Sequence, residues 1–202
     1  MAMFYSRSNR LFQEYSLDDY LRQIGNSLNE ALRNIPLSRI EESGEEALTK
    51  ELFGQFKISA PVIDEEKIDI DAKEADIEVV PELGFHDEPI TVRGFVIIVK
   101  IPFNGNGEMF NFSASTYSPS GTPEGEVEAG NLVLNYETRE KDPEKIKNLW
   151  KDDISSIKQN LSWIERDIEA FNATLEGNIK AGVLKRKKDA ENNKSIIDKL
   201  KD

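Results

Sequence analysis

The chain has no cysteine and a single histidine among its 202 residues. Without cysteine it forms no disulfide, zinc–thiolate site or iron–sulfur cluster, and it has no thiol nucleophile. One histidine excludes histidine-rich metal sites and serial proton relays. Long hydrophobic runs are also absent, because the most apolar segment, residues 95–99, is far shorter than the roughly 20 residues that a bilayer-spanning helix needs. We therefore expect no cofactor and no membrane partner.

Acidic side chains outnumber basic ones, with 38 Asp and Glu against 26 Lys and Arg and a net charge of −12. Such a chain is repelled by nucleic-acid phosphate and anionic lipid unless it concentrates its basic groups locally. The first ten residues lack the apolar segment of a secretory signal. Together with the missing cysteines, this predicts a cytoplasmic protein.

Hydrophobic periodicity changes twice along the chain and predicts an α+β fold. A helix is expected over residues 16–35, capped by Ser16 and stopped by Pro36, and a second over 45–56. Alternating residues then predict short, mostly antiparallel strands, of which 91–103 is the central one. Return strands are expected at 109–113, after the Asn104-Gly-Asn-Gly107 turn, and at 131–136, after Ala129-Gly130. The expected domains are an N-terminal helical segment, 1–57, an antiparallel β domain, 58–140, and a long C-terminal helix, helical hairpin or coiled coil, 141–202.

The C-terminal segment carries a long apolar seam, which predicts a helix from 144 to 183. Steps of three and four residues place seven apolar side chains on one stripe: Ile154, Ile157, Leu161, Ile164, Ile168, Phe171 and Leu175. A stripe of this length needs a cover, which we expect from a return helix at about 185–201 after a hinge at Gly182, from a second copy of the chain, or from both. Trp150 and Trp163 fall on or beside the seam and are expected in the core. Asn172 lies at its edge, where it either sets the register of a helix pair or faces solvent.

Two groups of residues are candidates for a metal-binding or catalytic site, and the sequence gives little support to either. Asp69 and Asp71 alternate within an acidic tract, but the glycine of a calcium-binding loop does not follow them. His86 lies beside carboxylates in a loop, without an identifiable nucleophile. A solvated face or a protein-docking surface explains the acidic tract, and an ordinary loop position explains His86, so the sequence predicts no catalytic, metal-binding or cofactor-binding residue.

The only dense basic run comprises Lys185, Arg186, Lys187 and Lys188. Lysine and arginine contacts to phosphate would give salt-sensitive affinity for nucleic acid. The run lies on a helical stretch rich in both signs of charge, where solubility is the favoured explanation. We do not expect a nucleic-acid partner, and this run marks the place where one would bind.

Several segments resemble, in order, a domain of uncharacterised bacterial proteins. They are Phe56-Lys-Ile-Ser-Ala-Pro-Val62, Val92-Arg-Gly94, Ile101-Pro-Phe-Asn-Gly105, Met109-Phe110 with Ser115-Thr116, and Phe171-Asn-Ala-Thr-Leu175 with Arg186-Lys187. In similar chains this domain lies N-terminal to, or beside, restriction-nuclease-like or TIR-type effectors, often in anti-phage defence. The resemblance covers residues ~50–190 and carries no catalytic signature. It implies that an effector domain follows this segment, or that the chain is a stand-alone version.

These observations predict a non-catalytic protein-recognition and oligomerisation module of a bacterial defence protein. Its expected partners are a second copy of the chain, an effector domain or another protein. Two alternatives stay open: a metal-dependent hydrolase that uses Asp69 and Asp71, and a nucleic-acid binder that uses the C-terminal basic run.

Overall fold

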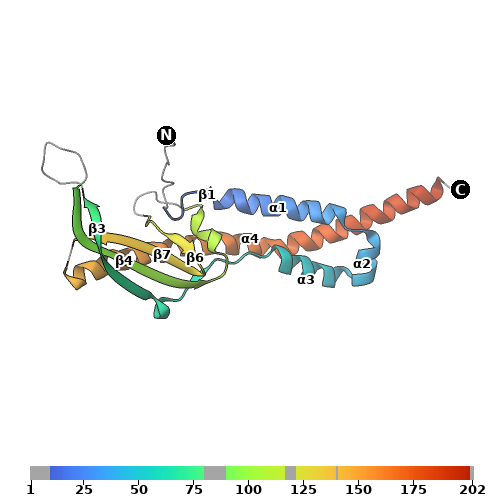
Figure 1. Cartoon of the computed structure of the whole chain (residues 1–202). Coiled ribbons are helices and arrows are strands. Elements are labelled where there is room, and N and C mark those ends of the chain that lie inside the picture. Colours follow the sequence, from blue (N-terminus) through green and yellow to red (C-terminus); the bar gives the residue numbers. More distant parts are fainter. Residues whose placement is uncertain (1–9, 80–89, 117–121, 140, 201–202) are drawn as a thin grey trace, which may run out of the picture. The chain divides into compact units, whose positions relative to one another are not determined.

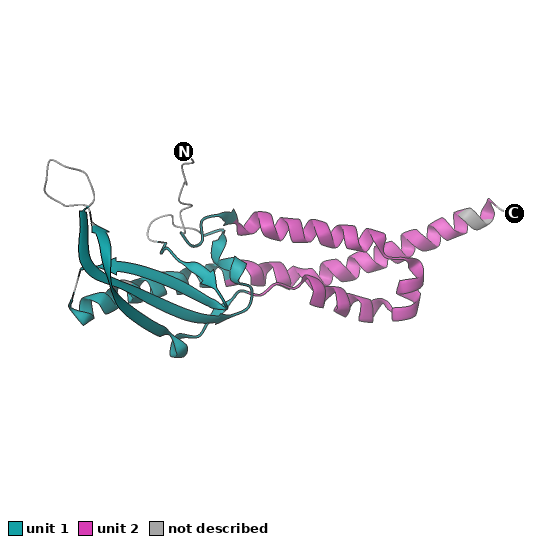
Figure 2. Cartoon of the chain, in the orientation of Figure 1, with its two compact units in different colours: residues 1–15, 60–164 teal, residues 16–59, 165–202 magenta. Residues whose placement is uncertain are grey.

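A computed structural model describes residues 10–79, 90–116, 122–139 and 141–200. The chain is an α+β protein with an antiparallel sheet and a long C-terminal helix, as the periodicity predicts. It divides into unit 1, residues 1–15 and 60–164, and unit 2, residues 16–59 and 165–202 (Figure 2). These units differ from the three consecutive segments expected from the sequence, because residues 10–15 group with the unit that contains the sheet and the C-terminal helix contributes to both units.

Unit 1 contains a curled antiparallel sheet (Figure 1). The central strand is β4 (Ile90–Asn104), which pairs along one side with β2 (Val62–Ile63) and β3 (Asp69–Val79) and along the other with β7 (Asn131–Thr138). The order is completed by β6 (Glu126–Glu128) next to β7. The prediction of a central strand is confirmed, and the alternating residues that precede it form one long strand, β3. A short 3₁₀ helix (Glu65–Lys67) links β2 to β3.

The hairpin of β6 and β7 is confirmed. Its turn residues Ala129 and Gly130 have φ angles of 46° and 81°. Two consecutive positive φ values give the backbone twist that suits a two-residue hairpin, and glycine adopts this conformation without steric cost.

The expected return strand at 109–113 is wrong. The segment forms a 3₁₀ helix (Gly107–Asn111) and the short strand β5 (Phe112–Ser113), neither of which pairs with β4. Asn106, which the sequence places in a hairpin turn, instead caps the 3₁₀ helix. Its side chain accepts a hydrogen bond from the Glu108 amide at 3.0 Å. Phe110 is then fully buried, with its ring centroid 5.0 Å from that of Phe103. Within β5, Ser113 donates through its hydroxyl to the carbonyl of Tyr15 in β1 (Tyr15–Ser16) at 3.0 Å.

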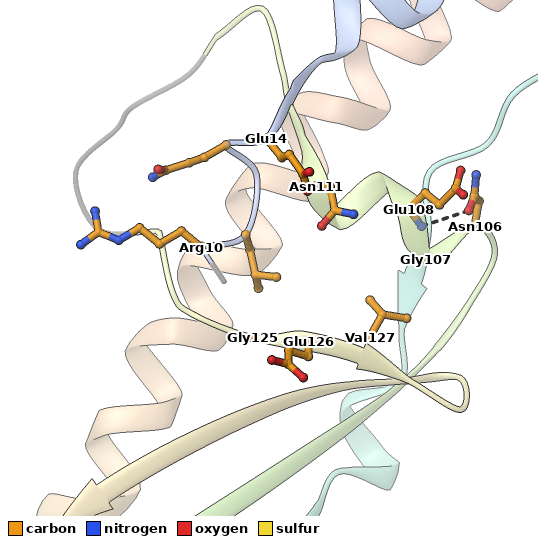
Figure 3. A pocket seen from close by; sticks show the side chains of 11 residues that line it. Arg10, Glu14, Asn106, Gly107, Glu108, Asn111, Gly125, Glu126 and Val127 are labelled. Atoms are coloured by element: carbon orange, nitrogen blue, oxygen red, sulfur yellow. Dashed lines mark hydrogen bonds between the residues drawn. The ribbon is translucent and has the colours of Figure 1, made fainter. Parts of the chain in front are cut away.

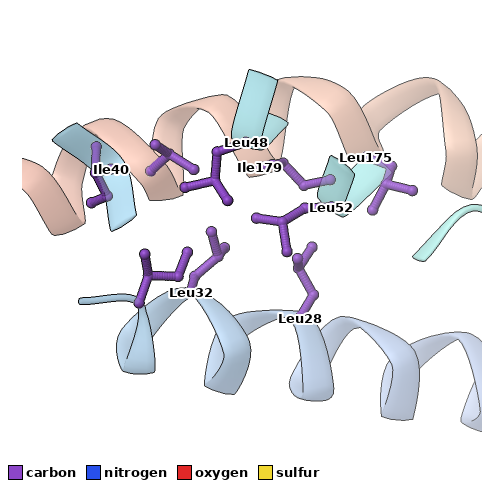
Figure 4. Close-up of a cluster of buried hydrophobic side chains, with 9 residues drawn as sticks. Leu28, Leu32, Ile40, Leu48, Leu52, Leu175 and Ile179 are labelled. Carbon is purple, nitrogen blue, oxygen red and sulfur yellow. The ribbon is translucent and has the colours of Figure 1, made fainter. Parts of the chain in front are cut away.

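Unit 2 is helical and consists of α1 (Leu17–Asn34), α2 (Leu37–Ser43), α3 (Glu45–Phe56) and the later part of α4 (Pro143–Lys199). The predicted cap is confirmed, because Ser16 accepts from the Asp19 amide at 3.3 Å. Leucine and isoleucine side chains of all four helices point toward one another and form a single core (Figure 4). Its buried members are Leu28, Leu32, Ile35, Ile40, Leu48, Leu52, Leu175, Ile179 and Val183.

Polar side chains of α4 fix the surrounding segments of unit 2 at defined positions. The Asn172 side chain donates to the carbonyl of Ile58 at 2.8 Å and accepts from its amide at 3.3 Å, so it holds the segment that leaves α3. Arg186 donates to the carbonyl of Ile35 at 2.8 Å, at the end of α1. These three bonds satisfy backbone groups of residues that lie just beyond the C-terminal ends of α3 and α1. Asn172 therefore holds a non-helical segment of the chain, which is neither of the two roles expected for it.

Helix α4 continues through Gly182 to Lys199, so the proposed hinge at Gly182 and the return helix at about 185–201 are both wrong. Gly182 serves a different purpose, because a Cβ added to it would lie 2.5 Å from Cδ1 of Leu32. Glycine thus allows α1 and α4 to approach closely at this point. Among the described residues, no helix has an apolar stretch long enough to cross a membrane.

A pair of glycines in α4 tests this close approach. A Cβ added at Gly177 would meet nothing within 4 Å, so Gly177→Ala should stabilise the protein by about 0.5–1 kcal/mol through helix propensity. Gly182→Ala gains the same propensity but must displace Leu32, an overpacking cost of about 1–3 kcal/mol. Urea unfolding followed by circular dichroism should therefore show Gly182→Ala to be the less stable variant. A Leu32→Ala background should remove the difference, whereas equal effects of the two substitutions would contradict the contact.

Candidate functional site

An apolar cleft of about 520 Å³ opens in unit 1 between the sheet and the first turns of α4. Strands β3 and β4 form one wall, and the start of α4 forms the other. The residues that line it are Ile70, Ala72, Phe95, Ile97, Lys141, Pro143, Ile146, Lys147 and Trp150. Its volume lies within the range of about 300–1,000 Å³ that is usual for ligand sites.

Strand alternation explains the sheet wall. Ile70 and Ala72 are two residues apart and therefore share one face of β3, opposite Val99 and Ile97 of β4. Ile97 is buried, but Ile70, on the strand that has β4 as its sole described neighbour, remains 47% exposed. An isoleucine in this position leaves apolar surface in contact with water.

Helical spacing explains the opposite wall. Ile146 and Trp150 are four residues apart on α4 and so lie on the same face of the helix. Both are only half-buried, whereas the next seam residues, Ile154 and Ile157, are 6% and 0% exposed. The cleft is thus the part of the apolar stripe at the start of α4 that the sheet covers incompletely. Asp142 caps this end of the helix by accepting from the Glu144 amide at 3.0 Å.

Tyr136 ties α4 to the sheet beside the cleft. It pairs with Ile97 in the sheet register, and its hydroxyl donates to the Asp153 carboxylate at 2.7 Å. Burial raises the pKa of Tyr136 above its ordinary value near 10, and the hydrogen bond to the ionised Asp153 raises it further. A second link joins Lys158 to Glu65 at 2.7 Å, between side chains that are about half exposed.

A second hollow in unit 1, of about 750 Å³, is lined by both polar and apolar residues (Figure 3). Its described walls carry the carboxylates of Glu14, Glu108 and Glu126, while Arg10 at its edge pairs with Glu124 at 3.6 Å. No hydroxyl, lysine or histidine side chain lies among the described residues that line it. This wall therefore offers carboxylate and amide groups, whereas the apolar cleft offers mainly hydrocarbon surface.

The predicted interaction seam is covered by the chain itself. Ile154, Ile157, Leu161, Ile164, Ile168 and Leu175 are each at most 7% exposed in the single chain, and Phe171 packs against the core of unit 2. Of the predicted core tryptophans, Trp163 is half-buried and Trp150 lines the cleft. The seam therefore offers no free surface to a second copy.

The acidic residues considered for metal binding do not converge. Asp69 and Asp71 alternate with Ile70 and so lie on the face of β3 opposite the cleft wall, where both are exposed. Within the described ranges, no three Asp, Glu or His side chains gather closely enough to hold a metal ion. His86 lies outside the described residues.

The basic run is partly used by the fold of unit 2. Arg186 bonds to the carbonyl of Ile35, and Lys187 pairs with Glu45 at 2.7 Å. This hydrogen bond with Glu45 raises the pKa of Lys187. Lys185 and Lys188 are exposed. Two of the four candidate phosphate contacts thus have structural partners, which weakens the run as a nucleic-acid site.

Sequence reasoning missed the sheet wall of the cleft. This wall consists of residues from two strands, Ile70 and Ala72 of β3 and Phe95 and Ile97 of β4. In the sequence, each of them has the pattern of a residue in the hydrophobic core. The sequence does contain one sign of the helical wall. Ile146 and Trp150 are spaced four residues apart and extend the apolar stripe of α4 toward the N-terminus of the predicted seam. Only the pairing of β3 with β4 shows that two walls face each other there.

The chain matches no family model, no curated protein and no solved structure. Its function is therefore inferred from its geometry and from the sequence resemblance given above.

Tyr136→Phe tests the link between α4 and the sheet. Removal of the hydroxyl should lower the free energy of unfolding at neutral pH by about 1–3 kcal/mol, because Asp153 loses its hydrogen-bond donor. Since the folded-state pKa of Tyr136 is the higher one, its contribution is complete below pH 10 and declines as the pH rises further. Urea titrations from neutral pH to above pH 10 should show a smaller alkaline loss in Tyr136→Phe than in the wild type. Parallel losses in both proteins would contradict the assignment.

Proposed function

We propose that the chain is a non-catalytic recognition module whose unit 1 binds a protein partner at the apolar cleft. The observation that carries the proposal is the exposed hydrocarbon wall of this cleft. Apart from two lysines, the described residues that line it are all apolar, and Ile70 is 47% exposed. Contiguous apolar surface of this kind in a highly charged protein is typical of interaction sites.

The same surface favours binding over chemistry. The Pro, Ile, Ala, Phe and Trp side chains exclude water and pack against an apolar group, but they transfer no proton and form no covalent intermediate. The two lysines, both exposed, are the only ionisable side chains among the described residues that line the cleft. The resemblance supports the wider setting, an anti-phage defence protein in which the occupied module acts on an effector. Oligomerisation through the seam is not part of the proposal, since those residues are buried in the single chain.

Site-specific photocrosslinking tests the proposal. Benzoylphenylalanine placed at Ile70 should form an adduct with one defined protein in cells of the natural source, because this position faces the cleft. The control position is Lys73, which is exposed on the opposite face of the same strand. Unlabelled wild-type chain should compete for the adduct, whereas a Phe95→Glu variant with an unchanged circular dichroism spectrum should not. The proposal fails if neither position gives an adduct, or if both positions give the same one.

A further inference from the structure

The side chains that line the apolar cleft offer a bound segment no hydrogen-bond acceptor. Apart from the two exposed lysines, the described lining residues have aliphatic or aromatic side chains. A lysine ammonium group donates hydrogen bonds and accepts none. The backbone N–H groups of a segment that enters the cleft therefore lose water without gaining a partner from these side chains, unless the segment satisfies them itself.

An α-helix meets this condition. Its backbone N–H and C=O groups bond to one another within the segment, so only its side chains have to enter the cleft. An extended segment instead turns backbone groups toward the hydrocarbon walls, and a buried backbone group without a partner is unfavourable. The chemistry of the walls thus favours a helical occupant.

The volume of the cleft indicates how much of a helix it accepts. At about 30 Å³ for each water molecule, 520 Å³ has room for about 17 water-sized groups. One leucine or phenylalanine side chain fills only part of this space. Side chains three and four residues apart lie on the same face of a helix, so two turns of one helix supply two or three of them together.

The wall formed by α4 has a surface that packs against another helix. Ile146 and Trp150 are four residues apart and form a ridge along α4. Side chains of a second helix fit into the grooves beside such a ridge. Further along α4, Ile154 is only 6% exposed, whereas the ridge itself is half-buried. A partner helix would complete the cover of this stripe.

The outer edge of β3 is the competing site, and it suits an extended segment. Within the described ranges β3 pairs only with β4, so backbone groups along its other edge are unpaired. A strand added there would place side chains on both faces of β3, including the face that carries Lys73. A helix in the cleft would contact only the face that carries Ile70 and Ala72. The two arrangements therefore touch different faces.

We infer that the partner segment is an amphipathic α-helix that places two or three large apolar side chains, three or four residues apart, in the cleft. The inference rests on the proposed function and specifies the form of the partner at the same site. An extended segment is the alternative occupant that the experiment distinguishes.

Three matched peptides without net charge test the helical form. The first is acetyl-Ala-Leu-Glu-Lys-Leu-Leu-Lys-Glu-Leu-Glu-Lys-Leu-Ala-amide, whose leucines have helical spacing. The second has proline in place of the central lysine, and so keeps every leucine but interrupts the helix. The third has the composition of the first, with leucine at every second position. Trp150 reports binding by its fluorescence in a Trp163→Phe background, since no peptide contains tryptophan.

The first peptide should bind saturably, and the proline peptide should bind about a hundredfold more weakly. The alternating peptide should also bind more weakly than the first, because its apolar side chains share one face only when it is extended. Equal affinities of the first two peptides, tighter binding of the alternating peptide, or no saturable binding of any peptide would overturn the inference.

Matched variants locate the binding. Ala72→Phe adds a ring on the cleft face of β3 and should weaken binding of the first peptide about tenfold, because the ring takes up space that the leucines need. Lys73→Phe adds the same ring on the opposite face and should leave the affinity unchanged. Circular dichroism checks that both variants are folded. Equal effects of the two substitutions would contradict binding in the cleft.

The two proposals fail in distinguishable ways. An adduct at Ile70 alone, together with tighter binding of the alternating peptide, leaves the recognition function in place and removes the helical partner. The same adduct at Ile70 and Lys73 indicates a strand added at the edge of β3 and removes both proposals. Absence of both adducts and peptide binding also removes both.

Discussion

The apolar stripe of α4 is the constraint on which the rest of the structure depends. Each large aliphatic side chain that is withdrawn from water contributes about 1.5–3 kcal/mol, so a stripe that continues from Ile154 to Val183 cannot remain uncovered in a stable monomer. In unit 1 the curled sheet lies against the helix, and in unit 2 helices α1, α2 and α3 supply the cover. Both units are thus organised around the same helix.

Hydrophobic burial is non-directional, so it does not by itself fix where each covering segment lies along the stripe. Polar contacts fix these positions. Tyr136 bonds to Asp153 in unit 1, while Asn172 and Arg186 bond to backbone groups of Ile58 and Ile35 in unit 2. The cover weakens at the start of α4, where Ile146 and Trp150 are only half-buried. The candidate binding site is therefore the incompletely covered end of the same stripe.

Local signals were sufficient for much of the fold. The Ser16 cap, the Ala129-Gly130 turn and the periodicity of the seam all act within a few residues, and the structure confirms each of these elements. The cover of the seam could not be predicted, because the stripe has the same pattern whether its partner is the same chain or another one. The cleft depends on the register between Ala72 and Ile97 and on the approach of Trp150, neither of which leaves a local signal.

Amide hydrogen exchange along α4 tests most directly whether the chain covers its own stripe. We expect strong protection from residue 154 to residue 183 and rapid exchange from 191 to 199, where the described side chains are exposed. This pattern should be unchanged when the protein is diluted, because the cover belongs to the same molecule. Protection of residues 154–183 that is lost on dilution would show that a second chain provides the cover and would contradict the account.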